Sequence, residues 1–463
     1  MPLILPGNVA SATAGAFSVD NSVRFNRDDE PALRKTPGSA GNRNTFTISM
    51  WVKRDVLEVY SPVLESVGNW ADFTNTDTFR IGLSAGAGNL ITNRKFRDIS
   101  AWYHLVIRVD TPQADADNRL RLYVNGVQET SLATNTAVTQ DYDSDFNNTG
   151  VLDILQDGGG RYFGGYGAEI IILDGTSAAP TEFGEFDEDS PSIWKPKKVS
   201  GLTFGTNGFY LDFKDSANLG NDANGGTDFT EVNLAAADQA TDTPTNNFCT
   251  MNPLDNYYSA ATFSEGNCYV VTGSTGYSHK SATIAVTKGK WVMEAKMISA
   301  VTPANLIVGI SDNQTLDTNA QLGYANYAYG YLGETGTIRN NNSAASYGDT
   351  YAQNDIIGVY LDLDNNKLYF TKNGTVQNSG TGKSITAVTS TTHGHYMFGL
   401  SDESNNSGTI ALNFGGCSAF SISSGNADPN GYGNFEYTTT ITGDGASKSF
   451  YALCTKNLAE FGG

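Results

Sequence analysis

The sequence is poor in the residues from which catalytic and metal centres are usually built. Its 463 residues include four histidines and four cysteines. No CxxC pair or other spacing typical of a metal site joins Cys249, Cys268, Cys417 and Cys454, so we expect free thiols, with a Cys249–Cys268 disulfide as the alternative. No GxSxG motif for a serine nucleophile is present either. We therefore expect no enzymatic activity, no cofactor and no bound metal.

Positive charge and long apolar runs are also scarce. Lys plus Arg amount to 29 against 49 Asp plus Glu, a formal net charge of −20. This balance argues against a broad basic surface for duplex nucleic acid or an anionic membrane. No window reaches the ~20 apolar residues of a membrane-spanning helix, and the segment 1–17 lacks the basic start of a secretory signal. We expect neither nucleic-acid binding nor membrane insertion.

Turn formers and aromatic residues are abundant instead. The chain holds 50 Gly, 23 Tyr and 23 Phe, a composition typical of β-sheet proteins with many loops. In FTISMWVK (46–53), apolar and polar residues alternate, which predicts a strand with one buried face. The strand RLRLYV (119–124) runs directly into Asn125-Gly126, a strong signal for a tight hairpin turn. We therefore predict an all-β fold with antiparallel sheets.

The length predicts more than one domain, because single domains rarely reach this size. Strand-like patterns fill both halves, whereas the stretch from 214 to 262 is polar, rich in Gly and Asn, and without alternation. A structureless stretch of this length is unusual inside one domain. The predicted parts are an extended docking arm (1–17), a β-sandwich (18–214), a polar connecting segment (215–262), a second β-sandwich (263–424), and a strand pair or subunit contact (425–463).

Motifs in each half resemble a known family. The first half resembles a laminin-G-like, concanavalin A-like jelly roll in FTISMWVK (46–53), WYHLVIRVD (102–110) and RYFGGYGAEIIILDG (161–175). The second half resembles a SPRY domain in KWVMEAKM (290–297) and, most specifically, in NDIIGVYLDLDNNKLYFTKNG (354–374). The two resemblances imply two antiparallel β-sandwich domains. Such folds host many functions, so they do not define one.

The chain as a whole resembles structural proteins of tailed, particularly marine, bacteriophages. The resemblance lies in PGNVASATAGA near the N-terminus, FDEDS…IWKP (186–196), TNGFYLDF (206–213) and ALCTKNLAEFG (452–462). It implies a virion protein assembled in the bacterial cytoplasm, most simply a tail fibre, spike or adhesin that binds a host-surface glycan or protein. It also implies a homo-oligomer, by analogy a trimer, whose N-terminal arm contacts other virion proteins.

Two alternatives remain open at this point. A capsid-decoration or head-fibre protein would have the same folds and another attachment point. A glycan-cleaving hydrolase on a concanavalin A-like scaffold would need two carboxylates roughly 5–10 Å apart beside aromatic residues. The acidic stretch 185–189 alternates suitably, but it is bounded by Gly, Ser and Pro, and we interpret it as a solvated loop.

Ligand contacts are predicted where aromatic and short polar side chains gather. In the segment 323–343, Tyr329 and Tyr331 fit a core strand, while the flanking positions are binding candidates. Another exposed aromatic residue is predicted in the polar stretch 67–77, either as a ligand contact or as a lid over one edge of the first sandwich. The candidate binding residues are Trp70, Tyr324, Tyr327, Arg339, Asn340 and Asn341.

One acidic loop has the spacing of a calcium site. Asp143, Asp145 and Asn147 stand at alternate positions, as oxygen ligands often do. The loop lacks the downstream bidentate Glu and the expected Gly, so we predict that it holds no metal.

Overall fold

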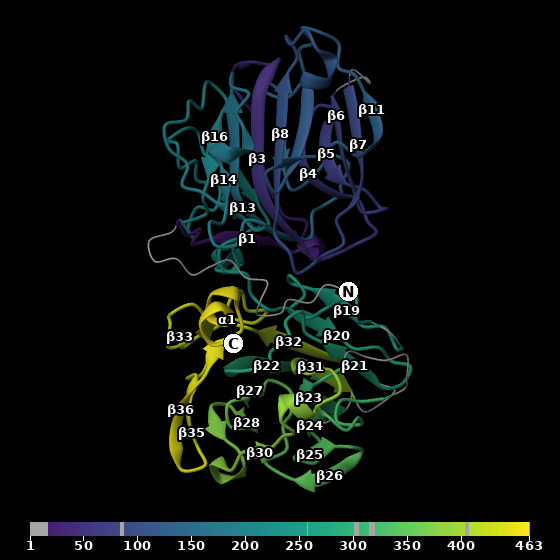
Figure 1. Ribbon diagram of the computed structural model, residues 1–463, viewed down its shortest axis with the longest axis vertical. Helices are drawn as coiled ribbons and strands as arrows, with labels where there is room; N and C mark the ends of the chain where they lie inside the picture. Colours follow the sequence, from purple (N-terminus) through teal and green to yellow (C-terminus); the bar gives the residue numbers. More distant parts are fainter. Residues whose placement is uncertain are drawn as a thin grey trace. The chain divides into compact units, whose positions relative to one another are not determined.

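A computed structural model describes residues 17–83, 88–256, 258–300, 305–313, 320–402 and 407–462. The chain divides into two compact units, the first running to Thr245 and the second starting at Asn246. Each unit contains its own pair of mainly antiparallel sheets (Figure 1). The prediction of an all-β protein with two β-sandwich domains is confirmed. The predicted docking arm 1–17 lies almost entirely outside the described residues.

The first unit is a sandwich of two large sheets, which we name sheet A and sheet B. Sheet A has the order β10(Val127–Gln128)-β9(Leu120–Val124)-β8(Tyr103–Asp110)-β3(Thr45–Arg54)-β13(Gly165–Asp174)-β1(Ser22–Phe25)-β18(Gln239–Ala240), with β16(Phe209–Leu211) also on β13. Sheet B has the order β11(Leu132–Thr136)-β7(Gly88–Lys95)-β6(Thr78–Leu83)-β5(Asn69–Phe73)-β4(Ser61–Ser66)-β12(Leu152–Ile154)-β2(Ala32–Lys35)-β17(Thr230–Val232).

Strand β3 shows how the alternating sequence builds this sandwich. Phe46, Ile48 and Met50 point into the core between the two sheets and are almost fully buried. The opposite face of β3 is buried as well, because the chain from 176 to 210 packs over sheet A. Sheet A is therefore covered on both sides.

A histidine lies beneath this covering segment. His104 is fully buried and stacks on Trp51, with ring centroids 4.6 Å apart. Its Nδ1 accepts a hydrogen bond from Trp194 Nε1 at 2.9 Å, so Nε2 carries the proton that reaches Ser49 Oγ, also at 2.9 Å. Burial lowers the pKa of His104 to about 3, so the ring is neutral at physiological pH.

The predicted connecting segment 215–262 is not a linker in the structure. Its first part completes the first unit: β17 pairs with β2, β18 pairs with β1, and Phe229 joins the core. Asp242 accepts hydrogen bonds from Lys53 and Trp102. The rest of the segment belongs to the second unit, where Phe248 bridges to Cys454. Short edge strands and side-chain caps hold this polar chain in place without the alternation that marks a central strand.

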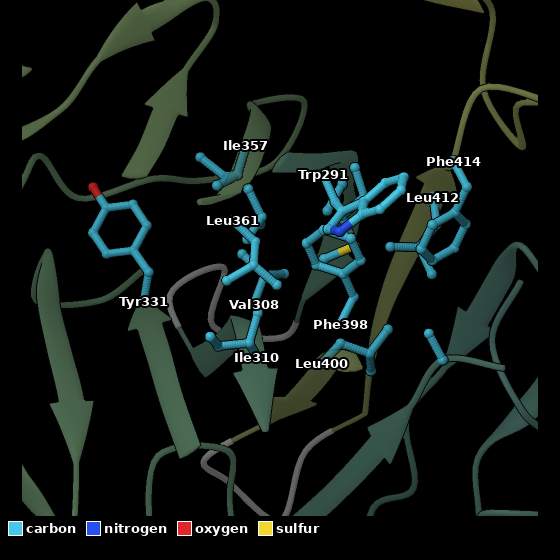
Figure 2. Packing of buried hydrophobic residues seen from close by; sticks show 14 of the residues in the cluster. Trp291, Val308, Ile310, Tyr331, Ile357, Leu361, Phe398, Leu400, Leu412 and Phe414 are labelled. Carbon is cyan, nitrogen blue, oxygen red and sulfur yellow. The ribbon is translucent and has the colours of Figure 1, made fainter. Parts of the chain in front are cut away.

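The second unit is also a sandwich, formed by sheet C and sheet D. Sheet C has the order β19(Thr262–Ser264)-β20(Tyr269–Val271)-β32(Gly408–Asn413)-β22(Lys290–Ala300)-β27(Ile356–Asp362)-β28(Lys367–Lys372)-β29(Thr375–Val376), with β30(Lys383–Ser384) on β28 and β37(Tyr451–Ala452) on β22. Sheet D has the order β21(Ser278–Ser281)-β31(Met397–Asp402)-β23(Leu306–Ser311)-β24(Ala328–Leu332)-β25(Thr337–Asn340)-β26(Ser343–Ser346). Figure 2 shows the core between them, with Tyr331 beside Ile357 and Val308.

The C-terminal stretch 425–462 packs mainly on the outer face of sheet C. It contains β33(Asn426–Ala427), β34(Asn434–Phe435), the hairpin β35(Thr440–Gly443)–β36(Ala446–Ser449), β37 and the short helix α1(Thr455–Phe461). Phe435 and Phe450 cover Tyr360 and Tyr369 of the sheet. The buried Glu294 of β22 accepts the amide N–H of Glu436 at 2.9 Å and of Tyr437 at 2.8 Å.

Two further properties follow from these elements. All four cysteines are free thiols, as predicted, and three of them are buried. Within the described ranges, no helix has the length and apolar character needed to cross a membrane.

Candidate functional site

The outer face of sheet B carries a row of functional side chains. Strand pairing aligns one residue from each of the eight strands, because directly opposed residues in a sheet share a face. Core residues such as Leu64 and Ala71 stand next to row members in the chain, so the row points away from the core. In strand order from β17 to β11, the sheet B row is Thr230, Arg34, Asp153, Glu65, Trp70, Gly82, Asn89 and Thr136.

Trp70 lies near the middle of this row, within strand β5 rather than in the predicted polar loop. Its indole packs flat on Gly82 of the neighbouring strand, where a Cβ atom would come within 2.2 Å of the ring. The Arg80 guanidinium carbon lies 4.3 Å from the Trp70 ring centroid. The indole is partly exposed, so it presents apolar aromatic surface among polar neighbours.

A second aromatic ring, Tyr60, extends this surface. The guanidinium carbons of Arg80 and Arg161 lie 5.0 Å and 5.1 Å from the Tyr60 ring centroid. Arg161, Tyr60, Arg80 and Trp70 therefore form a continuous series of cation–π contacts. Such stacking holds the long arginine side chains in fixed positions.

Each arginine of this face is also anchored by an aspartate. Arg80 donates to both carboxylate oxygens of Asp72, at 2.6 and 2.8 Å. Arg34 does the same to Asp153, at 2.6 and 3.3 Å, and Arg161 pairs with Asp157. The three aspartate side chains are at most 6% exposed. A bidentate pair uses only some of the five guanidinium donors, so each arginine keeps N–H groups for a ligand.

Two acceptors complete the face. Glu65 stands between Trp70 and Asp153 and accepts the Gly158 amide N–H at 2.6 Å, and no cation pairs with it among the residues described. On the other side of Gly82, Asn89 is partly exposed, although its Oδ1 atom is buried and accepts no hydrogen bond from the described part of the chain. The face thus offers aromatic surface, anchored donors and the carboxylate acceptor of Glu65, which is the chemistry needed to bind a polyhydroxylated ligand.

The other predicted binding residues gather in the second unit, around Gly323. Tyr324 is 52% exposed, whereas Tyr327 packs against the core. The Asn340 side chain donates to the carbonyls of Asn326 and Ala328, at 2.7 and 3.0 Å. Asn340 therefore ties the loop to strand β25 instead of facing a ligand.

Asn341 and Arg339 also contact the loop around Gly323. Asn341 and Asn342 have φ values of 50° and 53° and form the turn between β25 and β26, and their amides donate to the carbonyls of Ala325 and Gly323. Arg339 packs beneath Gly323. The structure thus brings Tyr324, Arg339, Asn340 and Asn341 together, and of these four Tyr324 and Asn341 are exposed while Arg339 and Asn340 are partly buried. We name this junction the 323 corner.

Two acidic segments have structural roles. Arg43 occupies the predicted non-metal loop, donating to Asp145 Oδ1 at 2.9 Å and to the carbonyls of Asp143 and Ser144. The stretch 185–189 belongs to a hairpin of β14(Gly184–Phe186) and β15(Trp194–Pro196), in which Asp187 is buried against Lys195. Across the described ranges, no group of three His, Cys, Asp or Glu side chains is placed to hold a metal ion.

Comparison with known proteins defines the class of both units. Residues 29–177 match the Laminin_G_3 profile of the concanavalin A-like lectin/glucanases superfamily, and residues 290–409 match the SPRY domain. The chain therefore carries a concanavalin A-like lectin/glucanase (laminin G) domain followed by a SPRY domain. At this level the resemblances predicted from the sequence are confirmed.

Matches to individual proteins are partial. The chain is 33% identical to the ATP-dependent RNA helicase DDX1 of Xenopus laevis over 124 residues, or 27% of this chain and 16% of that protein. It is 30% identical to Ran-binding protein 10 of Danio rerio over 125 residues, or 25% of this chain and 20% of that protein. It thus spans no more than a fifth of the length of either relative.

Solved structures of similar fold are distant. The SPRY domain of human HERC1 is 16% identical with a TM-score of 0.28, covering 37% of this chain and 99% of that chain. A Bacteroides ovatus protein provisionally described as carbohydrate binding is 16% identical with a TM-score of 0.36, covering 46% and 58%. These likenesses concern the fold alone.

Proposed function

We propose that this chain is a non-enzymatic binding protein whose concanavalin A-like domain binds glycans on the sheet B row. One observation carries the proposal: the outer face of sheet B presents Trp70 together with anchored arginines and acceptor side chains. Aromatic rings pack on the C–H faces of sugars, while fixed donors and acceptors bind their hydroxyl groups. Sheet A offers no equivalent face, because the chain from 176 to 210 covers it.

The biological setting that we propose is a bacteriophage tail fibre, spike or adhesin. The four segments that resemble phage structural proteins support it. In this setting the chain forms a homo-oligomer, by analogy a trimer, and its N-terminal arm contacts other virion proteins. The exposed Tyr324 of the 323 corner supplies a second contact to a host glycan or protein. Several weak sites on one particle act together through avidity. A capsid-decoration protein is the alternative setting.

Glycan binding is tested with the variant Trp70→Ala. The recombinant full chain is applied to a glycan array, and hits are measured by titration calorimetry. Loss of the indole should weaken binding at least tenfold, about 1.4 kcal/mol. The matched control is Trp194→Phe, which alters a tryptophan of the β14–β15 hairpin, away from the sheet B row, and leaves binding unchanged. Absence of glycan binding in the native chain, or equal affinity in Trp70→Ala, refutes the proposal.

Labelling of purified phage particles with an antibody to the chain tests the setting separately. Label at the tail supports an adhesin, and label over the head lattice supports decoration. A chain absent from particles refutes the virion setting and leaves glycan binding to its own test.

A hydrolase is the second candidate, and one observation favours it. Glu65 and Asp153 are direct partners on adjacent strands, and such residues have Cβ atoms about 4.5–5.5 Å apart, which allows their carboxyl groups to approach the separation of about 5–5.5 Å found in retaining glycosidases. Asp153, however, is already engaged by Arg34 through both oxygens, which favours a binding role. Release of reducing sugar by the native chain but not by Glu65→Gln would establish the hydrolase.

A further inference from the structure

We infer that the ligand of the sheet B row is a linear, uncharged glycan lying across the strands, several sugar units long. This inference rests on the proposed glycan binding and adds the shape and charge of the ligand. Three observations carry it: the extent of the row, the direction in which its polar groups are arranged, and its charge balance.

The row is long across the strands. It runs over eight strands, from Thr230 on β17 to Thr136 on β11. Neighbouring strands lie about 4.8 Å apart, so seven spacings give a platform of about 34 Å. A single sugar covers only a small part of this length, whereas a chain on the order of six units fills it.

Along the strands the platform is short. Strands β2, β12 and β17 have four, three and three residues, which correspond to about 10–13 Å. The side chains able to bind hydroxyl groups follow the cross-strand direction, with Arg34 and Glu65 on one side of Trp70 and Asn89 on the other. A linear ligand therefore meets more partners across the strands than along them.

The charges of the face almost cancel. Arg34, Arg80 and Arg161 each pair with an aspartate, which balances the charge of the guanidinium. Glu65 adds a fourth carboxylate, which forms no salt bridge among the described residues but helps to raise the pKa of the nearby Arg34 guanidinium. Three positive and four negative groups leave 3 − 4 = −1 on the face. This balance is unfavourable for a uronic-acid or sulfated glycan, whose charges would lie beside Glu65 next to Trp70.

Titration calorimetry on the full chain tests the inference with two series of oligosaccharides. The first contains neutral oligomers of two to eight units of whichever sugar the array identifies. The second contains carboxylated oligomers of equal length. We expect affinity for neutral oligomers to rise with length and level off near six units, with less than a twofold change between 50 and 500 mM NaCl. Carboxylated oligomers should bind at least tenfold more weakly.

Two variants locate the effect. Asn89→Ala should weaken binding of the longest oligomers several-fold and leave disaccharides unchanged, because Asn89 contacts only ligands that extend past Trp70. Glu65→Gln keeps the shape of the side chain and its acceptor for Gly158, and should bring carboxylated oligomers to within about threefold of neutral ones. The matched control for charge is Glu188→Gln, at an exposed position of the β14–β15 hairpin, which should change neither.

The possible failures are distinguishable. If no oligosaccharide binds, the proposed function itself is refuted. If binding depends on Trp70 but its affinity does not change with the length of the oligosaccharide, the inference of a linear glycan across the strands is overturned while glycan binding stands. If carboxylated oligomers bind as well as or better than neutral ones, and weaken with salt, the charge assignment is overturned.

Discussion

The buried ion pair between Arg54 and Asp77 gives the sharpest test of the packing of the first domain. Both side chains are completely buried, with Arg54 Nη2 3.2 Å from Asp77 Oδ1. Arg54 also donates to the Phe96 carbonyl and lies over the Phe73 ring. Asp77 further accepts from Arg97 Nε and from the Glu58 amide. In Asp77→Ala the Arg54 charge stays buried without its counter-ion.

The expected cost of Asp77→Ala is large. Removing one partner of a buried pair destabilises a protein by about 3–5 kcal/mol. For a domain of this size, each kcal/mol lowers the melting temperature by about 2–4 °C, so we expect a decrease of about 6–20 °C. Scanning calorimetry measures it, and the SPRY domain, which has its own core, provides an internal reference.

The control lies in the same network. Glu58→Ala removes an ion pair to Arg97 whose side chains are 70% and 48% exposed, and such pairs contribute about 0–1 kcal/mol. The double variant Arg54→Met/Asp77→Ala removes both charges and should recover much of the loss, because apolar replacements of buried pairs are often neutral. A loss below 1 kcal/mol in Asp77→Ala, or no recovery in the double variant, would show that Arg54 is not buried as described.

Two further predictions concern pH. His104, with its pKa lowered to about 3, stays neutral in the folded domain while the unfolded chain takes up a proton below about pH 6.5, so it costs stability as pH falls from 6.5 towards 3. We expect the free energy of unfolding, measured with urea, to fall less steeply with acidification in His104→Gln than in the native chain, by up to about 1.4 kcal/mol per pH unit. The same pH dependence in both proteins would contradict the buried neutral ring. Burial raises the pKa of Glu294 to about 7, so the folded SPRY domain holds an extra proton between about pH 4.5 and 7 and this residue's contribution to stability falls as pH rises through that window. In Glu294→Gln this fall in stability with rising pH should disappear. The buried His279, whose pKa is lowered to about 3, should still make the stability of the SPRY domain rise with pH. If the pH dependence of stability were unchanged in Glu294→Gln, the raised pKa of Glu294 would be contradicted.

Local patterns predicted much of the fold. The alternation in 46–53 correctly identified the core face of β3. Asn125 and Gly126 have the positive φ values, 48° and 78°, expected for the predicted hairpin turn. The segment 354–374 forms β27, a short turn and β28, as its pattern indicated. In each of these cases the signal lies within about twenty residues of chain, where turn chemistry and side-chain periodicity act directly.

Local sequence patterns could not predict most of the candidate site. Glu65, Trp70 and Asn89 are neighbours only because the strands pair in one register, and no local pattern specifies that register. Trp70 is among the predicted binding residues, but the sequence pattern places it in a loop, because NWADF lacks the length and the β-branched residues of a typical strand. The prediction of a connecting segment at 215–262 fails for a similar reason, because the short strands β17 and β18 within it are recognisable only from their partners β2 and β1.

The pairing of β37 with β22 sets the order in which the SPRY domain is completed during synthesis. Trp291 and Val292, near the start of the domain, pair in parallel with Tyr451 and Ala452 near its end. Leu458 of α1 then enters the same core as Trp291. Contacts between such distant parts of a chain form late, because a large loop must close first. Residues up to 458 must therefore have left the ribosome before this core closes, whereas the first domain has all of its strands once residue 245 has emerged.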